Sequence, residues 1–432
     1  MFDRPGLWGH ADFKRLWAAQ TISAFGSRIT RTALPIIAVA TLGESELIVG
    51  LLASLSLAPG AVLAFFAGGL VDRGHKRRIL IIADVIRAIA VASLTVAWGF
   101  GALRIGQVLA VAALVGAAST LFHIANVAYL PSLIGRDQLA EGNAKLESTE
   151  AIAEVSGPAS AGVLIAALGA PLAVAIDAVS YVWSAWMLRQ IRAVEPAPQA
   201  HVSSELASAS MWQSTMDLRV GMRAVFGNRH VRPIVIGLMV FWTSYGFFAA
   251  LYTLFCLRTL ALSQATFGVV VAFGGVGSII GALITRPIAR MIGIGPTLIL
   301  AATISALAGL MIPLASGPRW LALGFLGAHQ LIGDGFGVVF NVNQVTLRQT
   351  ALPAAQLGRA NAAIHICTEG IVPFAALAAG TLAALTSIRC ATWIGMAIAL
   401  AAPLCLLPLR KLKTLDSFHS EGAMSVGRDM AI

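Results

Sequence analysis

The sequence predicts an all-α integral membrane protein with twelve transmembrane helices in two pseudo-symmetric six-helix halves. Three observations support this fold class. Apolar residues make up 58% of the 432 residues and charged residues only 12%, whereas a soluble domain carries roughly 25% charged residues. Apolar ranges recur along the chain at the length that a bilayer requires. The longest polar gap divides these ranges six and six.

Twelve apolar ranges remain when the chain is divided at its charged or turn-rich gaps. Each range must be helical, because lipid offers the backbone no hydrogen-bonding partner and no range alternates with the period of a barrel strand. The predicted spans are 14–40, 47–70, 79–100, 105–133, 149–168, 170–190, 232–257, 265–288, 296–315, 319–346, 361–386 and 390–409.

The longest gap, 191–231, is predicted to be a cytoplasmic linker. Its first part is rich in Pro, Ala and Ser, as flexible linkers are. Its second part spaces Trp212, Met216 and Val220 four apart, which is typical of an amphipathic helix at the membrane surface. The other predicted parts are the N-terminal half 1–190, the C-terminal half 232–410 and the cytoplasmic tail 411–432.

An internal repeat supports this division. At a fixed offset of 218 residues, Gln138, Leu139 and Asn143 coincide with Gln356, Leu357 and Asn361. Matched Gln and Asn residues are informative in a composition dominated by Ala and Leu. Further matches at this offset are Gly50 with Gly268, Phe122 with Phe340, and Gly162 with Gly380.

The positive charges predict the orientation. Most of the 30 Lys and Arg residues lie in alternate gaps, which places both termini and residues 68–80 in the cytoplasm. We therefore expect a multi-pass protein of the inner cell membrane, with its basic loops against anionic lipid.

Several classes of function are disfavoured. The net charge of +10 is spread over the gaps, so nucleic acid is not an expected partner. The four cysteines are scattered and predict neither a metal site nor a cofactor. The chain has no Gly-Lys pair for a phosphate-binding loop and no hydrolase or metalloprotease motif, so we expect neither an ATP-driven pump nor an enzyme.

Residues 68–80, GGLVDRGHKRRIL, carry the most distinctive motif. The pattern of Gly68, Asp72, Arg73, Lys76 and Arg77 resembles the loop signature of the major facilitator superfamily, with a histidine in place of the second signature glycine. Five stretches resemble the branch that holds siderophore and macrolide exporters: GSRITRTALP (26–35), DVIRA (84–88), LPSLIGRDQLAEGNA (130–144), FNVNQVTLRQ (340–349) and LGRANA (357–362).

The resemblance implies that Asp72 latches the cytoplasmic side shut against the helix that begins near residues 360–363. A positive helix N-terminus stabilises an anion, which is consistent with this role. The neighbouring cations have a simpler interpretation: Lys76, Arg77 and Arg78 fix the topology.

Ionisable residues inside spans are costly and are therefore functional candidates. The expected proton-coupling residues are Asp334, Glu369, Glu154 and Asp177. Asp334 lies near mid-membrane among glycines, so desolvation favours its neutral form unless an arginine compensates. Arg28, at a similar depth, is the expected counter-charge.

The resemblance also implies that spans one, four, seven and ten line a central cavity. The resulting substrate candidates are Arg28, Arg31, His123, Asn126, Trp242, Tyr245 and Asn341. Each has an alternative: the arginines pair with carboxylates to hold the bundle together, the histidine is a hydrogen-bonded core residue, and the aromatic rings only pack. Asp84 and Arg87, three apart on one helix, favour a structural ion pair.

Gly157, Pro158 and Gly162 in span five resemble an element of the family's exporters. Pro158 removes a backbone donor, and small neighbours let the helix bend and pack closely; ordinary small-residue packing, as at Gly277 and Gly281, is the alternative. The resulting interpretation is a monomeric secondary transporter that exports a small organic compound in exchange for protons by alternating access. The alternatives are an importer by proton symport and a non-transporting receptor.

Overall fold

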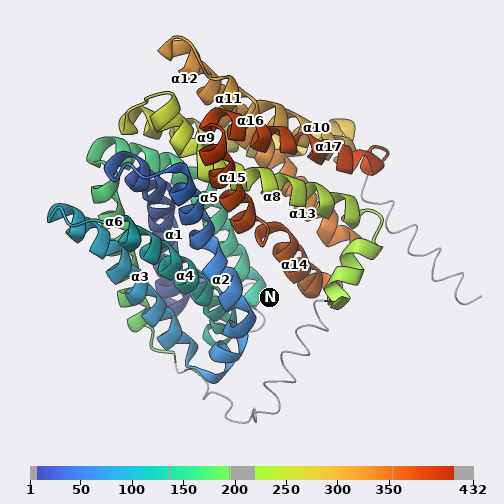
Figure 1. Ribbon diagram of the computed structural model, residues 1–432. Helices are drawn as coiled ribbons and strands as arrows, with labels where there is room; N and C mark the ends of the chain where they lie inside the picture. The colour runs from blue at the N-terminus through green and yellow to red at the C-terminus, as the bar shows by residue number, and fades with distance from the viewer. Residues whose placement is uncertain (1–6, 136–137, 194, 196–218, 353, 413–432) are drawn as a thin grey trace, which may run out of the picture. The chain divides into compact units, whose positions relative to one another are not determined.

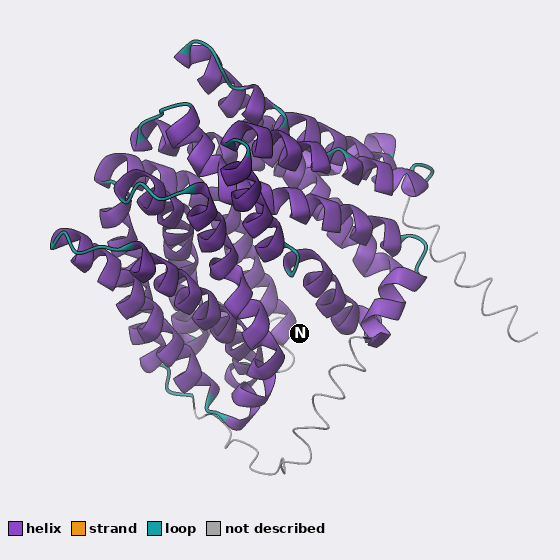
Figure 2. Ribbon diagram, viewed as in Figure 1, coloured by secondary structure: helices purple, strands orange, loops and turns teal. Residues whose placement is uncertain are grey.

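The computed structural model describes residues 7–135, 138–193, 195, 219–352 and 354–412. Within these ranges all regular structure is helical (Figure 2), which confirms the all-α prediction. Nine helices of the described chain are long and apolar enough to cross a membrane, and a bent pair, Glu141–Glu154 and Ser156–Leu168, makes up to ten. The count of twelve spans stays a prediction.

Helices in the first part of the chain lie over the first six predicted ranges (Figure 1). A π-helix, η2, continues the first of them. Helix α5 begins ten residues before its predicted range, because an ion pair between Lys145 and Glu141, 3.4 Å apart, joins successive turns of a charged segment. The elements are η1 (Leu7–Gly9), α1 (Ala11–Ile36), η2 (Ile37–Thr41), α2 (Glu46–Arg73), α3 (Lys76–Gly99), α4 (Ile105–Leu133), α5 (Leu139–Leu168) and α6 (Ala170–Arg189).

Most of the later predicted ranges hold interrupted helices. Predicted span ten, for example, is two α-helices joined by the π-helix η5. The elements are α8 (Val231–Leu254), η4 (Phe255–Thr259), α9 (Gln264–Ile292), α10 (Ile294–Gly309), α11 (Met311–Leu314), α12 (Arg319–Ala328), η5 (His329–Asp334), α13 (Gly335–Ala351), α14 (Ala354–Glu369), α15 (Val372–Leu385), α16 (Ile388–Ala399), α17 (Ala401–Leu406) and η6 (Leu407–Leu409).

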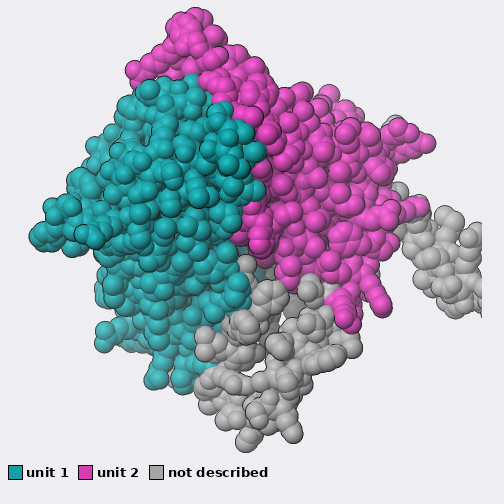
Figure 3. All heavy atoms as spheres, in the orientation of Figure 1, with its two compact units in different colours: residues 1–210, 249–272, 376–388 teal, residues 211–248, 273–375, 389–432 magenta. Residues whose placement is uncertain are grey.

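The chain forms two compact units (Figure 3). Unit 1 comprises Met1–Ser210, Ala249–Ala272 and Ala376–Ile388, and unit 2 comprises Met211–Phe248, Phe273–Ala375 and Arg389–Ile432. Inside unit 1, α1 and α3 pack on α6, and α2 packs on α4. Inside unit 2, α10 packs on α13 and η5. The division at residues 190 and 232 stays a prediction.

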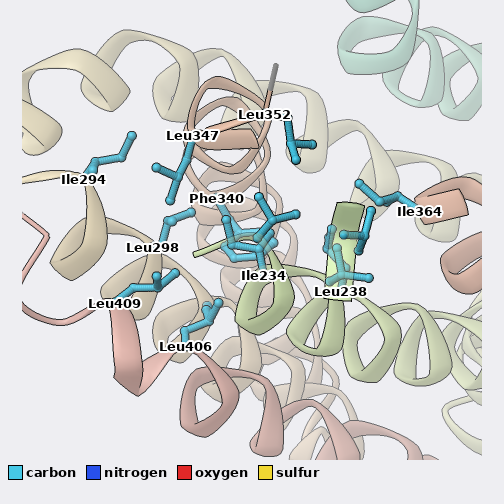
Figure 4. Close-up of a cluster of buried hydrophobic side chains, with 14 of the residues drawn as sticks. Ile234, Leu238, Ile294, Leu298, Phe340, Leu347, Leu352, Ile364, Leu406 and Leu409 are labelled. Atoms are coloured by element: carbon cyan, nitrogen blue, oxygen red, sulfur yellow. The ribbon is translucent and has the colours of Figure 1, made fainter. Parts of the chain in front are cut away.

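The hydrophobic cores of the two units use positions 218 residues apart. Leu80 and Phe122 in unit 1 correspond to Leu298 and Phe340 in unit 2. Figure 4 shows the two residues of unit 2, Leu298 and Phe340. The same offset relates further core pairs: Leu16 and Ile234, Ala83 and Ala301, Ile134 and Leu352, Leu188 and Leu406, and Ile191 and Leu409. It also relates the π-helices η2 and η4. This recurrence supports the predicted internal repeat.

Most of the predicted linker and tail lies outside the described residues. Residues 219–227 are helical. A Cβ atom at Gly221 would lie 2.2 Å from the carbonyl oxygen of Arg359, and Val225 is fully buried. This short helix therefore packs closely against α14.

Candidate functional site

Arg28 lies buried between α1 and α5. Its Nη2 atom is 2.5 Å from Oε1 of Glu150 and also pairs with Glu154, which Arg31 reaches at 3.7 Å. A Cβ atom at Gly157 would lie 2.5 Å from Cγ of Arg28, so this glycine makes room for the arginine stem. The partners of Arg28 in unit 1 are thus two α5 carboxylates, as in the bundle-holding alternative, and one is the predicted coupling residue Glu154.

The predicted ion pair of α3 is present. Asp84 and Arg87 contact each other and are 0% and 4% exposed. The guanidinium carbon of Arg87 lies 4.5 Å from the ring centre of Phe122 and 4.3 Å from that of Tyr181. A buried cation held by a carboxylate and two ring faces is typical of a rigid core contact.

Asp177 of α6 is fully buried against α1. Thr30 donates a hydrogen bond to Oδ2, and the hydroxyl of Ser180 lies 3.0 Å from Oδ1. A Cβ atom at Gly26 would lie 2.5 Å from Oδ1, so α1 approaches the carboxyl with bare backbone. Asp177 has no cation within 4.0 Å among the described residues, unlike Asp84.

The cavity candidates of α4 have different surroundings. Oδ1 of Asn126 accepts a hydrogen bond of 2.5 Å from Nε2 of Gln20, which joins α4 to α1. His123 is exposed, so it is not the core histidine of the alternative interpretation.

In unit 2, Asp334 ends η5 and faces α9. A Cβ atom at Gly274 would lie 2.2 Å from Oδ2 of Asp334 and 3.3 Å from Nε2 of Gln330. The room for this carboxyl therefore comes from Gly274 of α9 as well as from the glycines beside Asp334 in sequence. The sequence alone did not indicate Gly274. The other small residues of α9 pack on backbone: Cβ atoms at Gly277 and Gly281 would lie 2.3 and 2.1 Å from the carbonyl oxygens of Leu331 and Gly335.

Aromatic rings form a row along α8 that ends at η5. Ring centres are 5.2 Å apart between Trp242 and Tyr245, and 6.1 Å apart between Tyr245 and Phe248. Phe248 lies 5.9 Å from the ring of His329, whose Nδ1 is 3.0 Å from the carbonyl oxygen of Ala308. The row thus joins two substrate candidates to the segment that carries Asp334.

Two further candidates lie on α13 and α14. Asn341 is exposed, and its Oδ1 accepts a hydrogen bond of 2.8 Å from Gln344. Glu369 ends α14 with its Oε1 3.0 Å from Nδ1 of His365, and both side chains are well exposed. Glu369 is therefore less desolvated within unit 2 than its predicted position suggested.

The motif at residues 68–80 lies at the junction of α2 and α3. Gly68, Asp72 and Arg73 belong to α2. The structure describes their backbone only. Glu195, which the sequence analysis missed, accepts hydrogen bonds from the backbone amides of Lys76 and Arg77 at 2.7 and 3.3 Å, and so caps α3.

Arg77, predicted to fix the topology, also binds the end of α6. Its Nε donates a hydrogen bond of 2.8 Å to the carbonyl oxygen of Leu188, and its Nη2 donates to that of Arg189. These carbonyl groups end α6, where a cation is favourable.

Asp12 ties the start of α1 to the chain that follows α6. Burial would raise the pKa of Asp12. Hydrogen bonds from the amides of Arg192 and Ala193, and from the Arg15 side chain, instead hold this pKa below its usual value. Together with Glu195, Asp12 fastens this segment to α1 and α3.

Two close helix crossings lie in unit 1 at the ends of α2 and α5 remote from residues 68–80. A Cβ atom at Gly162 would lie 2.2 Å from the carbonyl oxygen of Gly268, and one at Gly380 would lie 3.0 Å from Cα of Gly50. Nη1 of Arg258 and Oε1 of Glu46 form an ion pair of 3.2 Å beside the second crossing. Gly162, predicted to bend α5, is thus a contact residue.

Apolar helices, buried ion pairs and paired glycine crossings are typical of a polytopic membrane protein. Residues 16–370 match the Major Facilitator Superfamily, so the chain belongs to this family, as the motif at 68–80 indicated. It is therefore a multi-pass membrane transporter and not an enzyme.

Some known proteins resemble this chain in sequence and others resemble it in structure. By sequence, the chain is 29% identical to macrolide efflux protein A of Streptococcus pyogenes over 166 residues, 38% of this chain and 40% of that relative. It is 25% identical to the enterobactin exporter EntS of Citrobacter koseri over 428 residues, 94% of this chain and 93% of the exporter.

By structure, the chain resembles a bacterial homologue of the iron transporter ferroportin in its inward-facing state, with a TM-score of 0.72, 15% identity and coverage of 93% of this chain and 98% of that one. It also resembles the nucleoside transporter NupG, with a TM-score of 0.68, 13% identity and coverage of 93% and 100%. These likenesses concern the fold alone.

Proposed function

We propose that this transporter exports a small organic compound from the cytoplasm in exchange for protons. The observation that carries the direction is the resemblance to the enterobactin exporter along nearly the whole chain. The 166-residue match to a macrolide efflux protein agrees with it. Structural neighbours such as the nucleoside transporter share the fold and favour neither direction.

Asp334 is the proposed coupling residue. Among the described residues of unit 2 it has no cation within 4.0 Å, and it lies where a π-helix meets an α-helix. Such π-helical segments are frequent at functional sites, and a partly buried carboxyl at a helix crossing exchanges its proton when water reaches it. Glu369 and Glu154 are the next candidates, although Glu369 is exposed within its unit and Glu154 is paired.

Alternating access requires contacts that open on each side in turn. We assign the glycine crossings Gly162 with Gly268 and Gly50 with Gly380 to the outer gate, because the pattern of positive charges predicts that residues 68–80 are cytoplasmic. Asp72 is the proposed cytoplasmic latch. Asp72→Asn is expected to favour opening towards the cytoplasm and to lower transport. Unchanged reactivity of cytoplasmic cavity cysteines in the variant would contradict the latch.

Export is tested by substrate movement in inverted membrane vesicles. A compound is first identified by growth inhibition of cells that lack the protein. Export predicts that the compound accumulates in inverted vesicles under an inside-acid pH gradient and that its addition dissipates the gradient. Accumulation only in right-side-out vesicles would show an importer instead. Binding without accumulation in either orientation would show a receptor.

A further inference from the structure

The interface of α1, α3 and α6 in unit 1 holds two carboxyl groups and one cation. Asp84, Arg87 and Asp177 are at most 4% exposed. Arg87 is committed to Asp84 and lies between the rings of Phe122 and Tyr181. An ionised carboxylate removed from water without its own cation is very unfavourable. If both carboxyls were ionised, this interface would therefore carry one uncompensated negative charge.

Other charged groups near this interface are also committed. Arg28 of α1 faces α5, where it pairs with Glu150 and Glu154. On the α1 side, Asp177 meets the backbone of Gly26 and the hydroxyl of Thr30. On α6 itself the nearby polar groups are hydroxyls, those of Ser180 and Tyr181.

The hydrogen bonds around Asp177 accommodate a proton on the carboxyl. The hydroxyl of Ser180 has one hydrogen and two acceptors in reach, its own helix carbonyl at Asp177 at 2.8 Å and Oδ1 of the same residue at 3.0 Å. If that hydrogen goes to the nearer carbonyl, Ser180 donates no hydrogen bond to the ionised carboxylate at Oδ1. A proton on Oδ1 instead donates to Oγ of Ser180, while Thr30 donates to Oδ2.

We propose that Asp177 is a resident proton-binding site of the first half, separate from Asp334, and that its proton allows α1 and α6 to pack closely. Loss of this proton would place an uncompensated negative charge against α1. Arg28 of α1 would not compensate it, because Arg28 is paired with Glu150 and Glu154. The site is independent of the direction of transport and of the coupling residue.

Infrared spectroscopy of the detergent-solubilised full chain at neutral pH, without substrate, tests the proposal. The difference spectrum between wild type and Asp177→Asn is expected to show the loss of a protonated carboxylic acid band. Asp84→Asn, the matched control on α3, should instead show the loss of ionised carboxylate bands. Loss of carboxylate bands in Asp177→Asn would overturn the proposal.

A second variant covers the case in which Asp177→Asn does not fold. Thr30→Val removes the hydroxyl that donates to Oδ2, so the protonated acid band is expected to shift to higher frequency. A shift confined to the ionised carboxylate bands would overturn the proposal. Both readouts are obtained without transport, so a failed export assay leaves them intact, and Asp334→Asn identifies any acid band that belongs to Asp334.

Discussion

Two helix crossings related by the 218-residue repeat differ in one respect. In unit 1, α4 crosses α2 at Gly116, where a Cβ atom would lie 2.3 Å from the carbonyl oxygen of Ser56. In unit 2, Asp334 is equivalent to Gly116 and Gly274 is equivalent to Ser56. There the carboxyl of Asp334 fills the space that a Cβ atom at Gly274 would need. The first crossing is backbone against backbone, whereas the second holds an ionisable side chain.

The helices around the two crossings differ accordingly. Helix α4 is continuous over Ile105–Leu133, whereas the equivalent helix of unit 2 becomes a π-helix at His329–Asp334. One repeat thus keeps a plain packing contact, and the other places an acid at an irregular turn. The proposed coupling residue Asp334 therefore has no acidic counterpart in the first repeat, and Gly274 is the residue of α9 that makes room for its carboxyl.

The largest effect is expected from Asp334→Asn. Removing the ionisable group should abolish transport driven by a pH gradient while substrate binding is retained. Uptake into proteoliposomes with only a proton gradient, together with equilibrium binding, measures both. Glu369→Gln is the control, because its exposed carboxyl should matter less. Accumulation by the Asn variant against a concentration gradient would show that the unit 2 crossing does not couple protons.

Gly116→Ala tests the backbone crossing. The new methyl group meets the carbonyl of Ser56, which cannot rotate away, so α2 and α4 must separate. We expect a loss of about 1–3 kcal/mol in the free energy of unfolding, visible as a lower thermal midpoint in detergent. An unchanged midpoint would mean that this crossing is loose.

Gly277→Ala provides the matching test in unit 2. Its methyl group would also meet backbone, at the carbonyl of Leu331. The expected loss is similar, about 1–3 kcal/mol, if the α9 side of the crossing is as closely packed as α2. A much smaller loss in the same thermal assay would show that the backbone of the π-helix η5 can move away from the new methyl group.

Gly274→Ala should separate coupling from packing. Its methyl group meets the end of a side chain, and the carboxyl of Asp334 can turn away, so we expect a stability change below about 1 kcal/mol but an altered pH dependence of transport. A thermal shift as large as that of Gly116→Ala would indicate that the carboxyl is locked in place.

The smallest effect on transport is expected from Asp12→Asn, because this acid lies outside both crossings. The folded pKa of Asp12 is lowered, so its contribution is present above the unfolded value near 3.8 and is lost as pH falls through the folded pKa. Its backbone hydrogen bonds suggest a loss of about 1 kcal/mol at neutral pH. Thermal midpoints of both proteins should converge in acid, and a constant difference would contradict this assignment.

Helix positions and the family followed from the sequence because apolar length and the charged motif are local signals. Partners were harder to predict. Within unit 1, Arg28 is held by Glu150 and Glu154, a pairing that depends on a glycine 129 positions away on α5. Gly274 carries no local signal, because its role depends on which helix it crosses. The capping role of Glu195 depends on the return of the chain after α6.

The glycine crossings of unit 1 have an evolutionary consequence. Gly50 meets Gly380 and Gly268 meets Gly162, while the repeat equates position 50 with 268 and position 162 with 380. Each of the two predicted halves therefore supplies one glycine to each contact, in the reciprocal pattern of an isologous two-fold dimer. A half-length chain with glycines at these two positions would carry both sides of the contact, so two copies of it could associate as a dimer.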